Sequence, residues 1–178
     1  MTKYFLFLLI SVFIIVTISC EQKAKNPREL SEEEARIEAV LQRAAFQTMD
    51  GEEVYLSDFA GKVVMIDFWE TWCGPCLMVF PALDSLKKEY GDEFVVLAVN
   101  TLTADTEVDV QEFLDKNNYD FSFSLDVNDI GGEVISLGIP FKVFIDPNGF
   151  LIKAELGSSG TEGDYLKAKA IIEDNKNL

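Results

Sequence analysis

An apolar segment, interrupted by one acid, that leads into a pair of closely spaced cysteines constrains the fold of this sequence more than any other feature. Residues 63–69 read Val-Val-Met-Ile-Asp-Phe-Trp, and Trp72-Cys73-Gly74-Pro75-Cys76 follows after two further positions. Apolar residues on both alternating faces indicate a central strand that is covered on both sides. We therefore expect a sheet between two layers of helices, with the cysteines where the central strand meets a helix.

The rest of the hydrophobic pattern predicts alternating strands and helices with a hairpin near each end. Asp50-Gly51 and Pro147-Asn148-Gly149 are typical hairpin turns, and each separates two short apolar segments. The expected strands are 45–49, 53–56, 63–69, 94–99, 121–125, 142–146 and 150–156, and the expected helices are 77–90, 107–117, 130–137 and 162–174. This order predicts an α/β fold, a three-layer α/β/α sandwich with a central mixed sheet and an N-terminal hairpin extension.

The first twenty residues are typical of an export signal. Lys3 precedes the apolar residues 4–18, a run shorter than the roughly 20 residues that cross a bilayer comfortably. Residues 17–20, Thr-Ile-Ser-Cys, resemble the lipobox of bacterial lipoproteins, which implies a signal peptide over 1–19 and acylation of Cys20. Thr17 departs from the large aliphatic residue usual there, so an uncleaved anchor or an ordinary secretory signal is the alternative. The resemblance places the protein in the bacterial cell envelope, lipid-anchored on the extracytoplasmic side of a membrane, most simply the periplasmic side.

The organisation that follows Cys20 is that of a tether, a helix and one folded domain. Residues 20–30 are polar and predict a lipid-anchored tether. Ser31 and Glu34 have the spacing of a capping box, so a helix is expected over 31–44. The remainder, 45–178, has the length of a single domain with its own core.

Charge and composition exclude several classes of function. The net charge of -16 argues against binding to nucleic acid, which depends on Lys and Arg that neutralise phosphates. The sequence contains no histidine, which removes Cys-His catalysis and the commonest metal ligand. Acid–base chemistry must therefore use carboxylates, lysines or thiols, and we expect no metal and no cofactor.

The cysteine pair has the spacing and the placement that thiol chemistry requires. Free backbone N–H groups at a helix N-terminus favour a thiolate, which predicts Cys73 as the nucleophile. Cys76, one turn further on, is placed to resolve a mixed disulfide, and Pro75 suits the first helical turn. A zinc half-site and a structural disulfide are the alternatives. Zinc would need two more ligands, and the third cysteine, Cys20, is remote.

Residues 46–157 resemble the thioredoxin superfamily, specifically its membrane-tethered, TlpA/ResA-like branch of thiol-disulfide oxidoreductases. The matching segments are Val54–Lys62, Phe68-Trp69, Trp72 to Cys76, Pro81 and Gly138-Ile139-Pro140. The resemblance implies that Pro81 kinks the active-site helix, unless it is merely tolerated there. It also implies that Pro140 forms a cis peptide beside Cys73 and exposes the Ile139 backbone to an extended substrate; an ordinary trans turn is the alternative.

Asp67 lies within the predicted central strand, where burial should raise the pKa of its carboxyl toward the working pH. Such a group can shuttle the proton of Cys76, although a purely structural acid, or one that reaches solvent, is the alternative.

Val79 stands where relatives devoted to cytochrome c maturation often carry an acid. Phe141 replaces the usual Thr, which suggests an altered substrate groove or simple packing. Glu70 and Thr71 are expected to be exposed turn residues.

The function that these features predict is the reduction of disulfides in extracytoplasmic proteins. The resemblance implies electrons from a membrane thiol donor, and we expect a monomer. The alternatives are a disulfide donor or isomerase, a thiol peroxidase of peroxiredoxin type, and a non-enzymatic tethered binding module.

Overall fold

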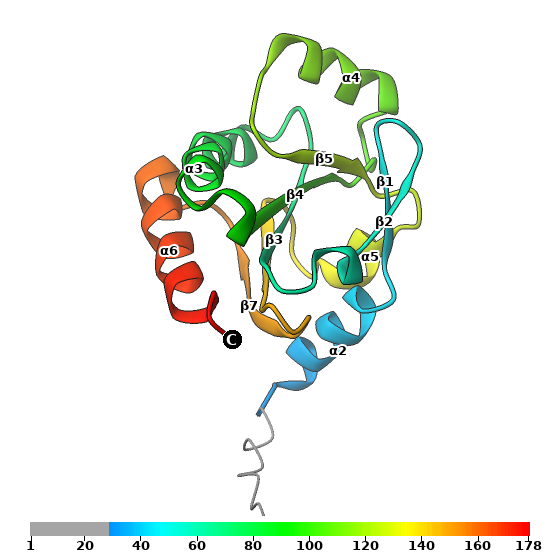
Figure 1. Ribbon diagram of the computed structural model, residues 1–178. Helices are drawn as coiled ribbons and strands as arrows, with labels where there is room; N and C mark the ends of the chain where they lie inside the picture. The colour runs from blue at the N-terminus through cyan, green and yellow to red at the C-terminus, as the bar shows by residue number, and fades with distance from the viewer. Residues whose placement is uncertain (1–28) are drawn as a thin grey trace, which may run out of the picture.

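The computed structural model describes residues 29–178, which form a mixed sheet between two layers of helices (Figure 1). This confirms the predicted fold class. The predicted signal peptide 1–19, Cys20 and most of the predicted tether 20–30 lie outside the described residues. Within 29–178, no helix is both long enough and apolar enough to span a membrane.

The strands of the described region form one sheet in the order β2-β1-β5-β4-β3-β6-β7. Their bounds are β1 (Ala45–Thr48), β2 (Glu53–Tyr55), β3 (Val63–Trp69), β4 (Phe94–Asn100), β5 (Ser122–Leu125), β6 (Phe141–Ile145) and β7 (Leu151–Leu156). The neighbours β3, β4 and β5 run parallel, whereas β1–β2, β1–β5, β3–β6 and β6–β7 are antiparallel. Both predicted hairpins are present, one at each edge of the sheet.

Helices cover the two faces of this sheet. Their bounds are α2 (Glu32–Leu41), α3 (Gly74–Tyr90), α4 (Glu107–Lys116), α5 (Ile130–Val134) and α6 (Gly160–Asn175), with short 3-10 helices η1 (Leu56–Phe59) and η2 (Gly91–Glu93). Buried residues of α3, α4 and α6 share one apolar cluster, and those of α2 and α5 share the other. The strand β3 contributes to both clusters and is buried at every position, as its sequence predicts.

Three helix boundaries differ from the predictions by three residues. The helix α2 ends at Leu41 and not at residue 44, because residues 42–44 form the turn into β1. The helix α3 begins at Gly74, three residues before the predicted start, because Pro75 fits a first helical turn where no N–H is needed. The helix α5 ends at Val134 and not at residue 137, because the chain turns extended at Ile135 before Gly138 and Pro140. The predicted capping box of α2 is present, with Ser31 Oγ accepting from the Glu34 N–H.

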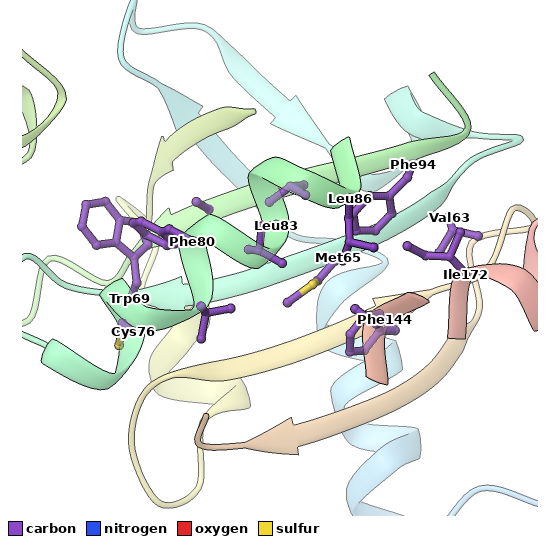
Figure 2. Packing of buried hydrophobic residues seen from close by; sticks show 14 of the residues in the cluster. Val63, Met65, Trp69, Cys76, Phe80, Leu83, Leu86, Phe94, Phe144 and Ile172 are labelled. Carbon is purple, nitrogen blue, oxygen red and sulfur yellow. The ribbon is translucent and has the colours of Figure 1, made fainter. Parts of the chain in front are cut away.

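The cluster beneath α3 and α6 is the larger part of the core and carries the cysteines (Figure 2). Phe80, on α3, is fully buried and its ring lies within 5.0–6.1 Å of a ring of aromatic neighbours: Trp69, Phe113, Tyr119, Phe121 and Phe123. Most of these pairs meet edge to face, which aromatic quadrupoles favour. This packing joins the active-site helix to β3, α4 and β5.

Phe80→Ala is expected to lower the free energy of unfolding by about 3–5 kcal/mol, because it leaves a cavity among these rings. The measurement is urea unfolding followed by circular dichroism. Met78→Ala on the same helix is the matched control, since this side chain is half exposed, and its effect should stay within about 0.5 kcal/mol. Equal effects of the two substitutions would contradict the assignment of Phe80 as the centre of this cluster.

Candidate active site

Cys73 and Cys76 form a disulfide at the point where β3 leads into α3. Cys73 is the N-cap of the helix, and its sulfur accepts a hydrogen bond from the Cys76 N–H at 3.3 Å. Gly74 and Pro75 occupy the first helical turn. Cys73 retains 3% of its surface exposed and Cys76 none, so Cys73 is the more accessible residue of the pair.

This position gives the first sulfur the electrostatics of an attacking thiolate. The opening N–H groups of α3 lack partners within the helix, and the helix dipole favours a negative charge at Cys73. The sequence Gly74-Pro75 brings the two sulfurs together within one turn, because the helix begins between them. The described residues hold no group of three or more His, Cys, Asp or Glu side chains that could bind a metal ion.

Asp67 is a fully buried carboxylate on the face of β3 that α3 covers. It lies on the same face of the strand as Met65 and Trp69, two positions before and after it, and these pack in the same cluster as Cys76 (Figure 2). Neither carboxylate oxygen has a hydrogen-bond partner. Burial raises the pKa of Asp67 to about 8, the positive charge of Lys142 opposes this rise, and the negative charge of Asp164 adds to it. The expectation of a raised pKa at this position is therefore met, and a group with such a pKa exchanges protons near neutral pH.

Glu70 is buried, and the prediction of an exposed turn residue is wrong. Only 1% of its surface is exposed, and its carboxylate accepts hydrogen bonds from the Trp72 indole N–H and the Thr101 hydroxyl. It also accepts from the backbone N–H groups of Thr103, at 2.9 Å, and Ala104. Because four donors converge on it, hydrogen bonds compensate the burial of this side chain. Glu70 thus ties the active-site turn to the loop after β4.

A second carboxylate strengthens the same connection. Asp105 accepts from the Thr71 N–H at 2.6 Å and the Thr71 hydroxyl at 2.7 Å, and also from the Asn100 side chain. Thr71 is half-buried, so its predicted exposure is also wrong. Sequence reasoning missed both carboxylates because the donors that join the turn to the loop, Thr101 for Glu70 and Thr71 for Asp105, lie more than thirty positions away along the chain. The only local signal was an acid, Glu70, placed directly after a strand that is buried at every position.

The peptide between Ile139 and Pro140 is cis. Ile139 lines a groove of about 380 Å³ together with Trp72, Thr103 and Gly138, so the proline segment and the active-site turn border one depression. Trp72 is 63% exposed at its rim. An extended chain bound here would lie against Trp72, beside Cys73.

The two remaining predicted features of this region concern Phe141 and Pro81. Phe141 is nearly buried and packs in the cluster of α2 and α5, on the face of the sheet opposite the cysteines. Its ring therefore packs, which is the second of the two expectations for it. Pro81 lies within α3, as predicted, and its carbonyl accepts from the Ser85 hydroxyl at 2.8 Å.

The fold and this site define a thioredoxin-like thiol-disulfide oxidoreductase, which acts on partners that carry disulfides. The family model described as Redoxin matches residues 34–172, and the chain belongs to this family.

The chain is similar to several thioredoxin-like proteins in sequence and in structure. The chain is 33% identical over 115 residues to the thioredoxin-like protein YneN of Bacillus subtilis, covering 64% of this chain and 68% of that protein. It is 38% identical over 107 residues to the thiol-disulfide oxidoreductase ResA of Oceanobacillus iheyensis, covering 58% of this chain and 54% of that one. The exposed lipoprotein thioredoxin Etrx1 of Streptococcus pneumoniae superposes with a TM-score of 0.61 at 29% identity, covering 71% of this chain and 98% of that one.

Asp67→Asn is expected to stabilise the oxidised protein, increasingly so as the pH rises. The folded protein keeps the Asp67 proton up to a pKa of about 8, whereas the unfolded chain loses it near the ordinary 3.8. Wild-type stability therefore falls between these values, by up to about 1.4 kcal/mol for each pH unit. Asn does not ionise, so its advantage should grow with that slope in urea unfolding measured between about pH 5 and pH 8.

Asp115→Asn, which removes an exposed carboxylate from α4, is the matched control for this experiment. A free-energy difference between Asp67→Asn and wild type that stays constant across this pH range would contradict the protonated, buried state of Asp67.

Proposed function

We propose that this protein reduces disulfides in extracytoplasmic proteins through a mixed disulfide on Cys73 that Cys76 resolves. The observation that carries the proposal is the asymmetry of the pair at the start of α3. Cys73 caps the helix and keeps some exposure, while Cys76 is fully buried one turn inside. A nucleophile must reach its substrate, and a resolving thiol needs to reach only its partner.

The reaction transfers two electrons from the pair to the substrate. The Cys73 thiolate attacks one sulfur of the substrate disulfide, and the other substrate sulfur leaves as a thiolate and takes up a proton. Cys76 then loses its proton and attacks Cys73, which forms the disulfide seen here and breaks the bond to the substrate. The second substrate thiolate takes up a proton, so a protein dithiol and a substrate disulfide exchange their oxidation states.

Asp67 is the group we assign to the proton of Cys76. A base works best when its pKa lies near the working pH, and burial brings Asp67 to about 8. Its carboxylate oxygens have no hydrogen-bond partner, which leaves them available for a proton. This supports a proton relay over a purely structural acid, since a structural carboxylate such as Glu70 is saturated with donors.

The groove between Trp72 and Ile139 supports binding of an extended substrate segment beside Cys73. Regeneration of the dithiol requires an external electron source, for which we propose a membrane thiol donor. We also propose that the protein acts as a monomer. Gly-Pro between the cysteines and Ile139 before Pro140 resemble the reducing members of the superfamily, which supports this direction over a disulfide donor.

A peroxidase of peroxiredoxin type is disfavoured by the position of the arginines. Such enzymes usually need an arginine beside the reactive cysteine. Within residues 29–178 the arginines are Arg36 and Arg43, which belong to α2 and the turn after it, and they pair with Glu33 and Glu133. Helix α2 packs on the face of the sheet opposite the cysteines.

Cys76→Ser is expected to accumulate a covalent complex with a disulfide-containing protein such as insulin, because the mixed disulfide on Cys73 cannot be resolved. Cys73→Ser is expected to form no such complex. Both variants carry Cys20→Ser to remove the third thiol, and the complexes are measured by non-reducing electrophoresis and mass spectrometry. A complex trapped through Cys76 in the Cys73→Ser variant would reverse the assignment.

We also propose that residues 1–19 are removed as a signal peptide and that Cys20 carries lipid at the extracytoplasmic face of the membrane. The lipobox-like residues 17–20 support this, and the similar Etrx1 is an exposed lipoprotein. In a bacterial host, labelled palmitate is expected to enter the wild-type chain and not Cys20→Ser. Equal labelling of the two chains, or none, would contradict the proposal.

A further inference from the structure

Three buried ionisable side chains from three different elements meet on the face of the sheet that carries the cysteines. Asp67 on β3, Lys142 on β6 and Asp164 on α6 are 0%, 2% and 3% exposed. Asp67 and Lys142 are direct neighbours across the antiparallel β3–β6 pair. The three side chains nevertheless differ in their hydrogen bonding, because neither oxygen of Asp67 has a hydrogen-bond partner.

The ammonium group of Lys142 is engaged by the other carboxylate. Its Nζ lies 2.7 Å from Asp164 Oδ1, and the next anion, Glu155 on β7, is 3.8 Å away. Asp164 is itself held in place, since it accepts from the Ser158 hydroxyl at 2.5 Å and from the Ser159 N–H at 3.2 Å. Burial works to raise the pKa of Asp164, but these hydrogen bonds together with that of Lys142 lower it, so the residue is an anion.

The position of this cation matters for the proton chemistry of Asp67. A cation directly on a carboxylate lowers its pKa by about one to three units. The charged groups that act on Asp67 are Lys142 from β6 and Asp164 from α6. Its β4 neighbour, Ala98, is uncharged, and Cys76 from α3 belongs to the apolar cluster on the same face of the sheet. Whether Asp67 binds a proton near neutral pH therefore depends on which carboxylate Lys142 pairs with.

We propose that Asp164 is a positioning residue for the dithiol reaction: by holding the Lys142 ammonium, it keeps this cation from pairing with Asp67 and leaves the Asp67 carboxyl to exchange the proton of Cys76. The inference rests on the proposed role of Asp67 in that exchange. In the resolving step the Cys76 S–H gives its proton to the Asp67 carboxylate. The new thiolate attacks Cys73, and the departing substrate thiolate takes the proton back from Asp67, so no external reactant is needed.

The test is a ¹³C NMR titration of the Asp67 carboxyl in the full chain in detergent micelles, in the reduced state. In Asp164→Asn, Lys142 is released toward Asp67, and the Asp67 titration is expected to move to lower pH by about one to three units. In the double variant Lys142→Met with Asp164→Asn the cation is absent, and the titration is expected to return to the wild-type pH or above. This rescue distinguishes control by the cation from loose packing, which the second substitution would worsen.

Matched controls come from ion pairs elsewhere on the surface. Asp84→Asn removes the partner of Lys88, and Lys116→Met removes an exposed lysine that pairs with Glu112. Neither is expected to move the Asp67 titration. An Asp67 titration that stays at the wild-type pH in Asp164→Asn would overturn the inference, as would a double variant that titrates like Asp164→Asn alone.

A second readout separates this inference from the proposed function. The rate at which Cys76 resolves a preformed mixed disulfide is followed against pH in single-turnover experiments. The midpoint of this profile is expected to shift to lower pH in Asp164→Asn by the same amount as the NMR titration. An Asp67→Asn profile identical to wild type would overturn the proton relay itself, whereas the NMR titration would still decide which carboxylate controls the position of Lys142.

Discussion

The structure depends on one constraint: β3 is buried on both faces and ends at the N-terminus of α3. Burial on both faces requires a helix layer on each side, and the two apolar clusters meet through alternate residues of this strand. The short connection to α3 then places Cys73 where free N–H groups favour a thiolate. Fold and chemistry therefore follow from the same segment, since the strand that organises the core also delivers the reactive sulfur.

Two carboxylates near this junction show how surroundings decide the role of a buried acid. Glu70 receives hydrogen bonds from four residues and joins the active-site turn to the loop after β4. Asp67 receives none, and burial raises its pKa to about 8. A buried carboxylate that accepts several hydrogen bonds stabilises the structure around it, whereas a buried one without hydrogen-bond partners gains or loses a proton near neutral pH. The ion pair of Lys142 with Asp164 belongs to this contrast, because it removes the nearest cation from Asp67.

Local pattern was sufficient to predict the strands, both hairpins, the two faces of the sheet and the cysteine pair. Each of these depends on residues close together in the chain, such as the alternation in 63–69 or the turn at Asp50-Gly51. The burial of Glu70 and the pairing of Lys142 with Asp164 could not be predicted in this way. Lys142 and Asp164 are 22 positions apart, and three of the four donor residues of Glu70 lie 31 to 34 positions away from it, so these contacts form only when the sheet and α6 assemble. The start of α3 was misplaced for a local reason, because Gly and Pro are poor helix formers except in the first turn.

The claim that the pair works as a reductant is tested most directly by its equilibrium reduction potential. The protein is titrated against defined ratios of reduced and oxidised dithiothreitol or glutathione, and the redox state is followed by tryptophan fluorescence, since Trp72 adjoins Cys73. The account predicts a value near the roughly -270 mV of thioredoxin. A value near -120 mV, about that of a strong disulfide donor, would contradict it and reverse the direction of electron flow.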